Sequence, residues 1–262
     1  MIQNNVSVAE IIEESNNNVI PFSIIKNDDF VCRKKNKDEV GESCEVYAFR
    51  TQEELAAMLK VLNKHIKEAT NNDQKKSACR NKLLFLIGIN VGIRASDLRT
   101  LKWSFFFDRQ DNGKLEYKKF YSLQPMKQRK QNKFVKLFFN QAVKTAIDDY
   151  IAQYPIEDLD DHLFLSRKGD ESLTVHSLRR IIKNIASEAG IKQNIGSHSL
   201  RKTFGFWRWH EAKDKNKALV ILQQAFQHSS PNVTARYIGI LDDEIEDMFC
   251  SVELGLDMMD LE

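Results

Sequence analysis

Apolar residues recur at helical spacing along most of the chain. Thr51 and Glu54 have the spacing of a capping box at the start of a helix. Four apolar residues follow at helical intervals: Leu55, Met58, Leu62 and Ile66. A further apolar run, 82–91, is long enough for a buried helix, and Gly92 is suited to end it. The pattern therefore places Arg94 in a turn between two helices.

Helical spacing returns in the second half of the chain. It predicts helices near 143–151, 175–190, 198–211 and 217–227. Pro231 suits the first position of one more short helix, because proline lacks the N–H that such a position leaves unpaired.

Between residues 103 and 140 the pattern changes to Phe, Tyr and Val mixed with Lys. Turn-forming residues interrupt it at 111–113 and again near 128–132, which predicts three short antiparallel strands joined by hairpins. The expected fold class is therefore α+β: a mostly helical domain with a small three-stranded antiparallel sheet.

These patterns divide the chain into three parts. Residues 1–45 show no sustained periodicity and are interpreted as an N-terminal arm or small subdomain. Residues 46–240 contain the predicted helices and strands and form the main domain. Residues 241–262 are acidic, and Ile245, Met248, Phe249 and Val252 recur in them at helical spacing, so we interpret this part as a C-terminal helix or tail.

Composition excludes several classes of protein. In 262 residues, 42% are hydrophobic, yet no apolar run approaches the roughly 18 residues that a membrane span needs. The first residues lack the pattern of a secretory leader, so a cytoplasmic protein without membrane contact is expected. The four cysteines lie far apart, without the spacing of a zinc site or a disulfide framework, and no metal is expected.

Charge is unevenly distributed although the net charge is only +2. Residues 102–136 contain ten Lys or Arg and three acids, whereas 242–262 contain nine acids and no Lys or Arg. A basic middle segment suits a polyanion such as DNA. The alternative at this point is an ordinary solvated face rich in charge.

Four residues near the C-terminus are candidates for chemistry on a phosphate. His198 and Arg201 are three apart, so on a helix they share a face and can both reach one phosphate. His228 is followed nine residues later by Tyr237. The four letters at 198–201 also occur at His176, but within an ordinary amphipathic pattern, which favours a surface helix for that copy.

Three separated motifs resemble those of the tyrosine recombinases of the phage integrase family. LFLIGINVGIRASDLRTLKW (84–103) is similar to the first arginine box of the family, and HSLRKTF (198–204) to its His-x-x-Arg box. FQHSSPNVTARY (226–237) resembles its Leu-Gly-His-Ser…Thr-x-x-Tyr signature. The motifs stand in the family's order, and the resemblance spans roughly residues 45 to 250. It implies that 46–240 is a catalytic domain.

The resemblance also implies roles. Arg94 and Arg201 would hold the non-bridging oxygens of a DNA phosphate, His198 and His228 would hydrogen-bond the same group, and Tyr237 would attack phosphorus. Two fixed guanidiniums can neutralise the charge of the transition state, so no cofactor is required. Tyrosine is a poor nucleophile at neutral pH, and it needs nearby cations and a proton acceptor, which the two arginines and His228 would supply.

The family also uses a lysine in a β-hairpin to protonate the departing 5′ oxygen. Lys127 stands at the family's usual place before the hairpin turn, with Lys130 and Lys133 as alternatives. The basic residues expected to contact double-stranded DNA are Lys102, Lys127, Arg129, Lys130, Lys133 and Lys202.

Three departures from the family pattern keep alternatives open. Lys202 stands where many relatives have a second His, and Gln227 replaces the usual Gly before His228. Residues 1–45 are too few for the helical domain that usually closes a clamp on DNA. The leading interpretation is a site-specific recombinase or integrase that self-associates on DNA, in part through its C-terminal helix. The alternatives are a DNA-binding regulator without strand exchange and, less favoured, a type IB topoisomerase.

Overall fold

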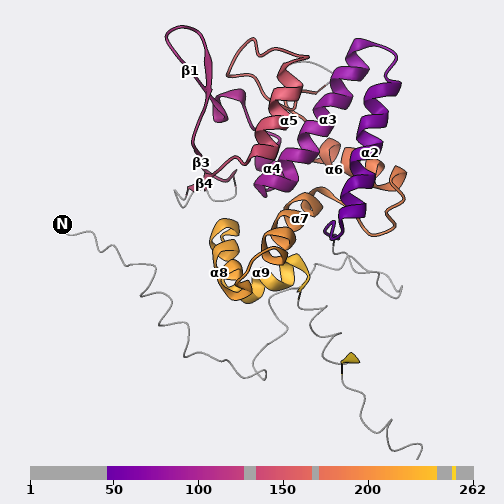
Figure 1. The fold of residues 1–262 in the computed structure, drawn as a ribbon, viewed down its shortest axis with the longest axis vertical. Helices are drawn as coiled ribbons and strands as arrows, with labels where there is room; N and C mark the ends of the chain where they lie inside the picture. The colour runs from indigo at the N-terminus through magenta and orange to yellow at the C-terminus, as the bar shows by residue number, and fades with distance from the viewer. Residues whose placement is uncertain (1–45, 127–133, 167–170, 241–249, 252–262) are drawn as a thin grey trace, which may run out of the picture. The chain divides into compact units, whose positions relative to one another are not determined.

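The computed structural model describes residues 46–126, 134–166, 171–240 and 250–251, all within one compact unit, 44–262. They form helices and short antiparallel strands (Figure 1), which confirms the α+β class. In chain order the described elements are α2 (Gln52–Glu68), α3 (Asn72–Val91), α4 (Ala95–Leu98), η2 (Trp103–Phe105), β1 (Phe107–Arg109), β2 (Leu115–Tyr117), β3 (Tyr121–Leu123), β4 (Val135–Leu137), α5 (Gln141–Ile151), α6 (Val175–Glu188), α7 (Ser197–His210), α8 (Lys215–Phe226) and α9 (Pro231–Ile238). None of the described helices is both long and apolar enough to cross a bilayer.

Local signals set the ends of the first helices. The Glu54 N–H donates to Thr51 Oγ1 over 3.1 Å, and the Glu54 carboxylate accepts from the Thr51 N–H, so the predicted capping box is confirmed. Gly92 ends α3 with φ of 68°, a left-handed conformation that glycine adopts without strain. A Cβ at Gly92 would also lie 2.2 Å from the ring of Phe204 on α7. Glycine is thus required there by both conformation and space.

The main core lies between α2, α3, α5 and α6, with α2, α3 and α5 running side by side in Figure 1. Each helix turns its apolar stripe inward, as the helical spacing predicts. The buried residues that these helices contribute include Met58, Leu62, Leu83, Leu84, Ile87, Val143, Ile147, Leu178, Ile182 and Ile185. The scaffold that carries Arg94 at the end of α3 is therefore rigidly packed.

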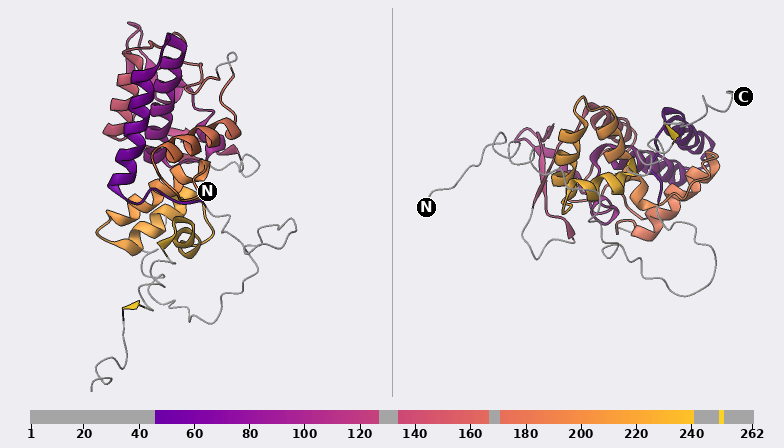
Figure 2. Two further views of the ribbon diagram at one scale, coloured as in Figure 1. Left: turned by 90° about the vertical axis from the view of Figure 1, so that its right-hand side faces the viewer. Right: turned by 90° about the horizontal axis from the view of Figure 1, so that it is seen from below.

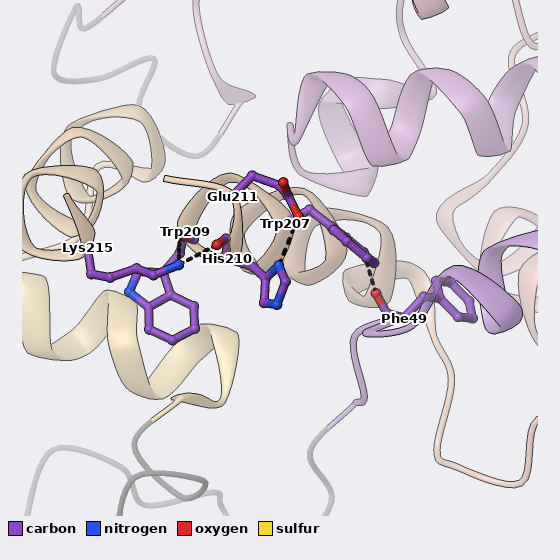
Figure 3. Close-up of polar contacts among 6 residues, drawn as sticks. All are labelled: Phe49, Trp207, Trp209, His210, Glu211 and Lys215. Carbon is purple, nitrogen blue, oxygen red and sulfur yellow. Dashed lines mark hydrogen bonds and ion pairs between the residues drawn. The ribbon is translucent and has the colours of Figure 1, made fainter. Parts of the chain in front are cut away.

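A second, smaller apolar cluster joins α7, α8 and α9, which lie at one end of α2 and α3 (Figures 1 and 2). Its buried members are Ala48, Phe206, Leu222, Phe226, Ala235, Ile238 and Ile240. Glycines allow close packing of α7 against both clusters: a Cβ at Gly88 on α3 would lie 2.6 Å from Leu200 of the main core, and one at Gly205 would lie 2.6 Å from Ile238. At the end of α7, the Lys215 ammonium donates to the carbonyl oxygens of Trp209 and His210 (Figure 3).

The strands form two separate two-stranded ladders among the described residues, so the expected single three-stranded sheet is wrong: its middle strand is divided into β2 and β3, which belong to different ladders. In β1–β2, Phe107 pairs with Tyr117, and in β3–β4, Tyr121 pairs with Leu137. The Lys118 N–H donates to Phe106 O over 2.8 Å, which extends the first ladder before the chain enters β3. The expected turn at 111–113 does join β1 to β2, and the second expected turn, near 128–132, lies outside the described residues.

Candidate active site

Arg94 lies in the turn between α3 and α4, as the sequence predicts. It is the N-cap residue of α4, and its carbonyl oxygen accepts from the Asp97 and Leu98 N–H groups over 2.9 and 2.8 Å. Its side chain is half-buried and lines a cavity of about 680 Å³, together with Asp97 and Arg201. The first arginine is thus fixed at its backbone, while its side chain faces a solvent-accessible space.

Arg201 on α7 is a buried cation, with 6% of its surface exposed. Its Nη1 donates to Gly92 O over 2.7 Å and its Nη2 to Phe226 O over 3.0 Å. The guanidinium carbon lies 4.0 Å from the centroid of the Phe226 ring, a cation–π distance. Arg201 therefore connects the turn that holds Arg94 to the end of α8, just before His228.

Burial lowers the pKa of Arg201 to about 10, and the nearby positive charge of Arg94 also lowers it. Tyr237, through its charge interaction and a hydrogen bond, and Asp97 act in the opposite direction. Even at this pKa the guanidinium is protonated at neutral pH. A guanidinium has five N–H donors, so the two carbonyl bonds leave others for an anionic ligand.

Tyr237 lies on α9, and its hydroxyl meets the other candidates. Its oxygen is 3.4 Å from His198 Nδ1, and Arg201 hydrogen-bonds the same side chain. The Tyr237 ring packs edge-on against the rings of His228 and Phe226, with centroids 5.1 and 5.7 Å apart. Residues from α7, α8 and the loop before α9 thus surround the Tyr237 side chain, and two of them, His198 and Arg201, hydrogen-bond it.

The α9 helix begins where the sequence predicts. Ser230 is its N-cap, with Oγ accepting from the Val233 N–H over 3.3 Å, and Pro231 occupies the first helical position. The helix has eight residues, so Tyr237 lies in its last turn.

His228 precedes α9 and is half-buried beside two arginines. Its Nδ1 lies 3.0 Å from Thr234 Oγ1. Burial lowers its pKa to about 4, and the charges of Arg201 and Arg94 lower it further in the same direction. His228 is therefore neutral at physiological pH and a weak base. For the proton of Tyr237, the exposed imidazole of His198 is the better placed acceptor.

The lowered pKa of His228 predicts acid-sensitive stability. Below the ordinary His pKa of about 6.5, the unfolded chain binds a proton at His228 that the folded chain does not bind. The free energy of unfolding is then expected to fall as the pH drops from about 6.5 to 4, with a slope approaching one proton. The measurement is the melting temperature as a function of pH. In His228→Gln the decrease between about pH 6.5 and 4 that is due to His228 should be absent.

The matched control for this measurement is His176→Gln, since His176 is exposed on α6. That variant should keep the acid sensitivity of the unmodified chain. Superimposable curves for His228→Gln and the unmodified chain would contradict the expected linkage.

Asp97 is a site residue whose role the sequence did not indicate. Its carboxylate is buried, with 2% exposed, and accepts from the Met126 N–H over 2.9 Å. It also favours the charged form of Arg201. Asp97 thus fixes the segment that leads directly into Lys127. The sequence signal for Asp97 is its place in the arginine box, three residues after Arg94. This place does not reveal its hydrogen-bond partner, Met126, which is 29 positions away.

Other sequence candidates have different placements. Lys127, Arg129, Lys130 and Lys133 lie outside the described residues. Lys102 forms an ion pair with Asp160, with 3.5 Å between Nζ and Oδ1. His176 lies in the exposed first turn of α6, as expected for a surface helix. Within the described ranges, no three or more His, Cys, Asp or Glu side chains are grouped as metal ligands.

Residues 50–244 match the model of the family described as phage integrase family. The chain belongs to the phage integrase family. A probable integrase/recombinase, YoeC of Bacillus subtilis (strain 168), is 30% identical over 164 residues, which is 63% of this chain and 80% of YoeC. Tyrosine recombinase XerH of Campylobacter jejuni is 29% identical over 188 residues, 71% of this chain but 48% of XerH.

Solved structures of phage integrase family relatives share the fold. XerA recombinase matches with a TM-score of 0.54 and 17% identity over 82% of this chain and 66% of XerA. XerH bound to a palindromic difH substrate, in a post-cleavage complex, matches with a TM-score of 0.53 and 21% identity over 79% of this chain and 54% of XerH. The chain thus spans only about half the length of XerH.

Two departures from the phage integrase family pattern acquire a structural meaning. Gln227 has φ of 56° at the C-cap of α8, a left-handed conformation, which explains why glycine is usual at this position. Lys202 is buried, with 6% exposed, and its ammonium lies 5.5 Å from the centroid of the Tyr237 ring. This lysine thus lies at the face of the candidate nucleophile's ring.

Proposed function

We propose that this chain is a site-specific recombinase that cleaves and rejoins double-stranded DNA through a 3′-phosphotyrosine intermediate at Tyr237. The observation that carries the proposal is the convergence of His198, Arg201 and His228 on the Tyr237 side chain. A protein that only bound DNA would not need a phenol held between a guanidinium and an imidazole.

The reaction begins when Arg94 and Arg201 bind the non-bridging oxygens of the scissile phosphate. The Tyr237 oxygen attacks phosphorus and its proton passes to His198. The new P–O bond replaces the bond from phosphorus to the 5′ oxygen. That oxygen leaves with a proton from a hairpin lysine, for which we propose Lys127.

Rejoining reverses these steps. The 5′ hydroxyl of the same or another strand attacks the phosphotyrosine and gives its proton to the hairpin lysine, and the phenol leaves with a proton returned by His198. One phosphodiester bond is exchanged for another through an ester of similar energy. The chain therefore needs no ATP and leaves no permanent break.

DNA binding is proposed to use the basic segment between 102 and 136, with Lys102, Lys127, Arg129, Lys130 and Lys133 at the backbone phosphates. XerH, a relative, has been solved in complex with its difH substrate, which supports DNA as the partner. Phosphate contacts of this kind depend on salt, so binding should weaken steeply as the salt concentration rises.

The direct test uses nicked suicide duplexes tiled across the DNA that flanks the protein's own gene. In such a duplex, cleavage releases a short fragment that cannot return, so the covalent complex accumulates. We expect a labelled protein–DNA adduct that survives denaturing electrophoresis and maps to the peptide containing Tyr237. Retarded duplexes without any adduct would instead establish a DNA-binding regulator.

We further propose self-association on DNA through residues 241–262, which lie outside the described residues except for 250–251. Apolar residues at helical spacing in an acidic frame suit a helix that docks on protein. Deletion of 241–262 should therefore reduce assembly on a duplex to single protomers, measured by light scattering. Assembly that persists in the deleted chain would contradict this use of the tail.

A further inference from the structure

The segment before α2 is fixed to α7, the helix that carries His198 and Arg201. The Phe49 N–H donates to Thr203 Oγ1 over 2.9 Å, and Trp207 Nε1 donates to Phe49 O over 2.9 Å (Figure 3). Phe49 itself is fully buried. The backbone at Arg50, the next residue, is thereby held at a defined place beside α7.

From this place Arg50 reaches the end of α9. Its Nη2 donates to Gly239 O over 2.9 Å, two residues after Tyr237. The guanidinium carbon lies 5.4 Å from the ring centroids of both Tyr47 and Phe206, so aromatic faces hold it on two sides. Because carbonyl oxygens at a helix C-terminus carry partial negative charge, a guanidinium there is favourable.

The C-cap of α9 is shaped around this guanidinium. Gly239 has φ of 80°, and a Cβ on it would lie 2.2 Å from Arg50 Nη2. Any other residue at 239 would therefore both strain the backbone and displace Arg50. The α9 helix has only two turns, and its start is fixed by Ser230, so the Arg50 contact fixes its other end.

We propose that Arg50 is a positioning residue for the nucleophile. It joins the end of α9 to α7 and so sets the Tyr237 hydroxyl relative to His198 and Arg201. The inference rests on the proposed cleavage by Tyr237. Displacement of about 1 Å in a reacting group can reduce a rate by about a hundredfold. Arg50 touches neither phosphate nor Tyr237 in this mechanism, so its loss should affect rate and not DNA affinity.

The test compares single-turnover adduct formation at saturating suicide duplex. Arg50→Ala should lower the rate constant by about tenfold to a hundredfold, while the dissociation constant of the duplex stays within about twofold. Arg50→Lys should recover most of the rate, because an ammonium can still donate to Gly239 O. The inference would be overturned if Arg50→Ala formed the adduct as fast as the unmodified chain, because Arg50→Lys would then have no defect to rescue.

The matched control is Arg80→Ala. Like Arg50, Arg80 donates to a main-chain carbonyl, Leu165 O, but it is buried and lies on α3, away from α7 and α9. At a temperature where all variants are folded, Arg80→Ala should keep the rate constant within about twofold. If Arg80→Ala and Arg50→Ala lowered the rate constant equally, general destabilisation would explain the defect and the inference would be overturned.

A second variant tests the contact itself. Gly239→Ala should show the same rate defect, and the double variant with Arg50→Ala should be no slower than the slower single variant. If the fold reduction of the rate constant in the double variant equalled the product of the two single reductions, the two positions would act separately, which would contradict the inference. If the unmodified chain formed no adduct, the proposed function would fail together with the inference. If Arg50→Ala cleaved DNA at the normal rate, the proposed cleavage by Tyr237 would still hold and only the positioning role of Arg50 would be disproved.

Discussion

Replacing Tyr237 with Phe should abolish covalent attachment to DNA and leave the fold and DNA binding nearly unchanged. The substitution removes one oxygen atom, which is the proposed nucleophile and the atom 3.4 Å from His198 Nδ1. The ring can keep its contacts with His228 and Phe226. Loss of a nucleophile commonly costs more than about 10⁴-fold in rate, so the labelled adduct should fall below detection.

The matched control for this prediction is Tyr117→Phe. The Tyr117 hydroxyl donates to the Asp148 carboxylate over 2.7 Å, and burial together with this carboxylate raises its pKa. Tyr117 is therefore a poor nucleophile, and its variant should lose some stability while forming the adduct at the normal rate. An adduct formed by Tyr237→Phe would require another residue to attack the DNA.

Replacing Arg201 with Ala should damage both stability and chemistry. The change leaves Gly92 O and Phe226 O without their buried donor and removes the cation from the face of the Phe226 ring. Each unpaired buried group costs about 1–3 kcal/mol, so the free energy of unfolding should fall by roughly 2–5 kcal/mol. For a domain of this size, a loss of 1 kcal/mol lowers the melting temperature by about 2–4 °C. Calorimetry should therefore show a decrease of roughly 4–20 °C.

The same variant should form adduct at least about 10²-fold more slowly, since a fixed donor to the transition state is lost. Arg94→Ala separates the two effects. Arg94 is only half-buried, and its backbone carbonyl accepts the hydrogen bonds that form its turn. The Arg94→Ala variant should therefore lose adduct-formation rate by a factor comparable to that of Arg201→Ala, with a much smaller change in melting temperature. An Arg201→Ala chain that melted like the unmodified chain would contradict the proposed double role.

The features that the sequence predicted best are those that depend only on residues close together in the chain, such as the ends of helices. The capping box at Thr51, the left-handed end of α3 at Gly92 and the start of α9 at Pro231 each depend on residues within one turn. The ordered motifs also named His198, Arg201, His228 and Tyr237, which the fold brings together.

Contacts between distant segments could not be predicted in the same way. The residues between the two expected turns were predicted as one strand, and their local pattern did not show that they divide into β2 and β3, which pair with different neighbours. Asp97 and Arg50 act through main-chain groups 29 and 189 positions away. Lys202 was interpreted as a DNA contact because it is basic, and only the fold shows it against the Tyr237 ring.

The bonds of Arg201 to the main chain constrain how this protein can lose activity during evolution. A lineage that kept the fold for DNA binding alone would be free to replace Tyr237, whose hydroxyl contributes little to the core. It would not be free to replace Arg201, which joins α7 to the end of α3 and the end of α8. Inactive descendants are thus expected to retain Arg201 long after the tyrosine has gone, so among homologues Tyr237 reports on catalysis and Arg201 does not.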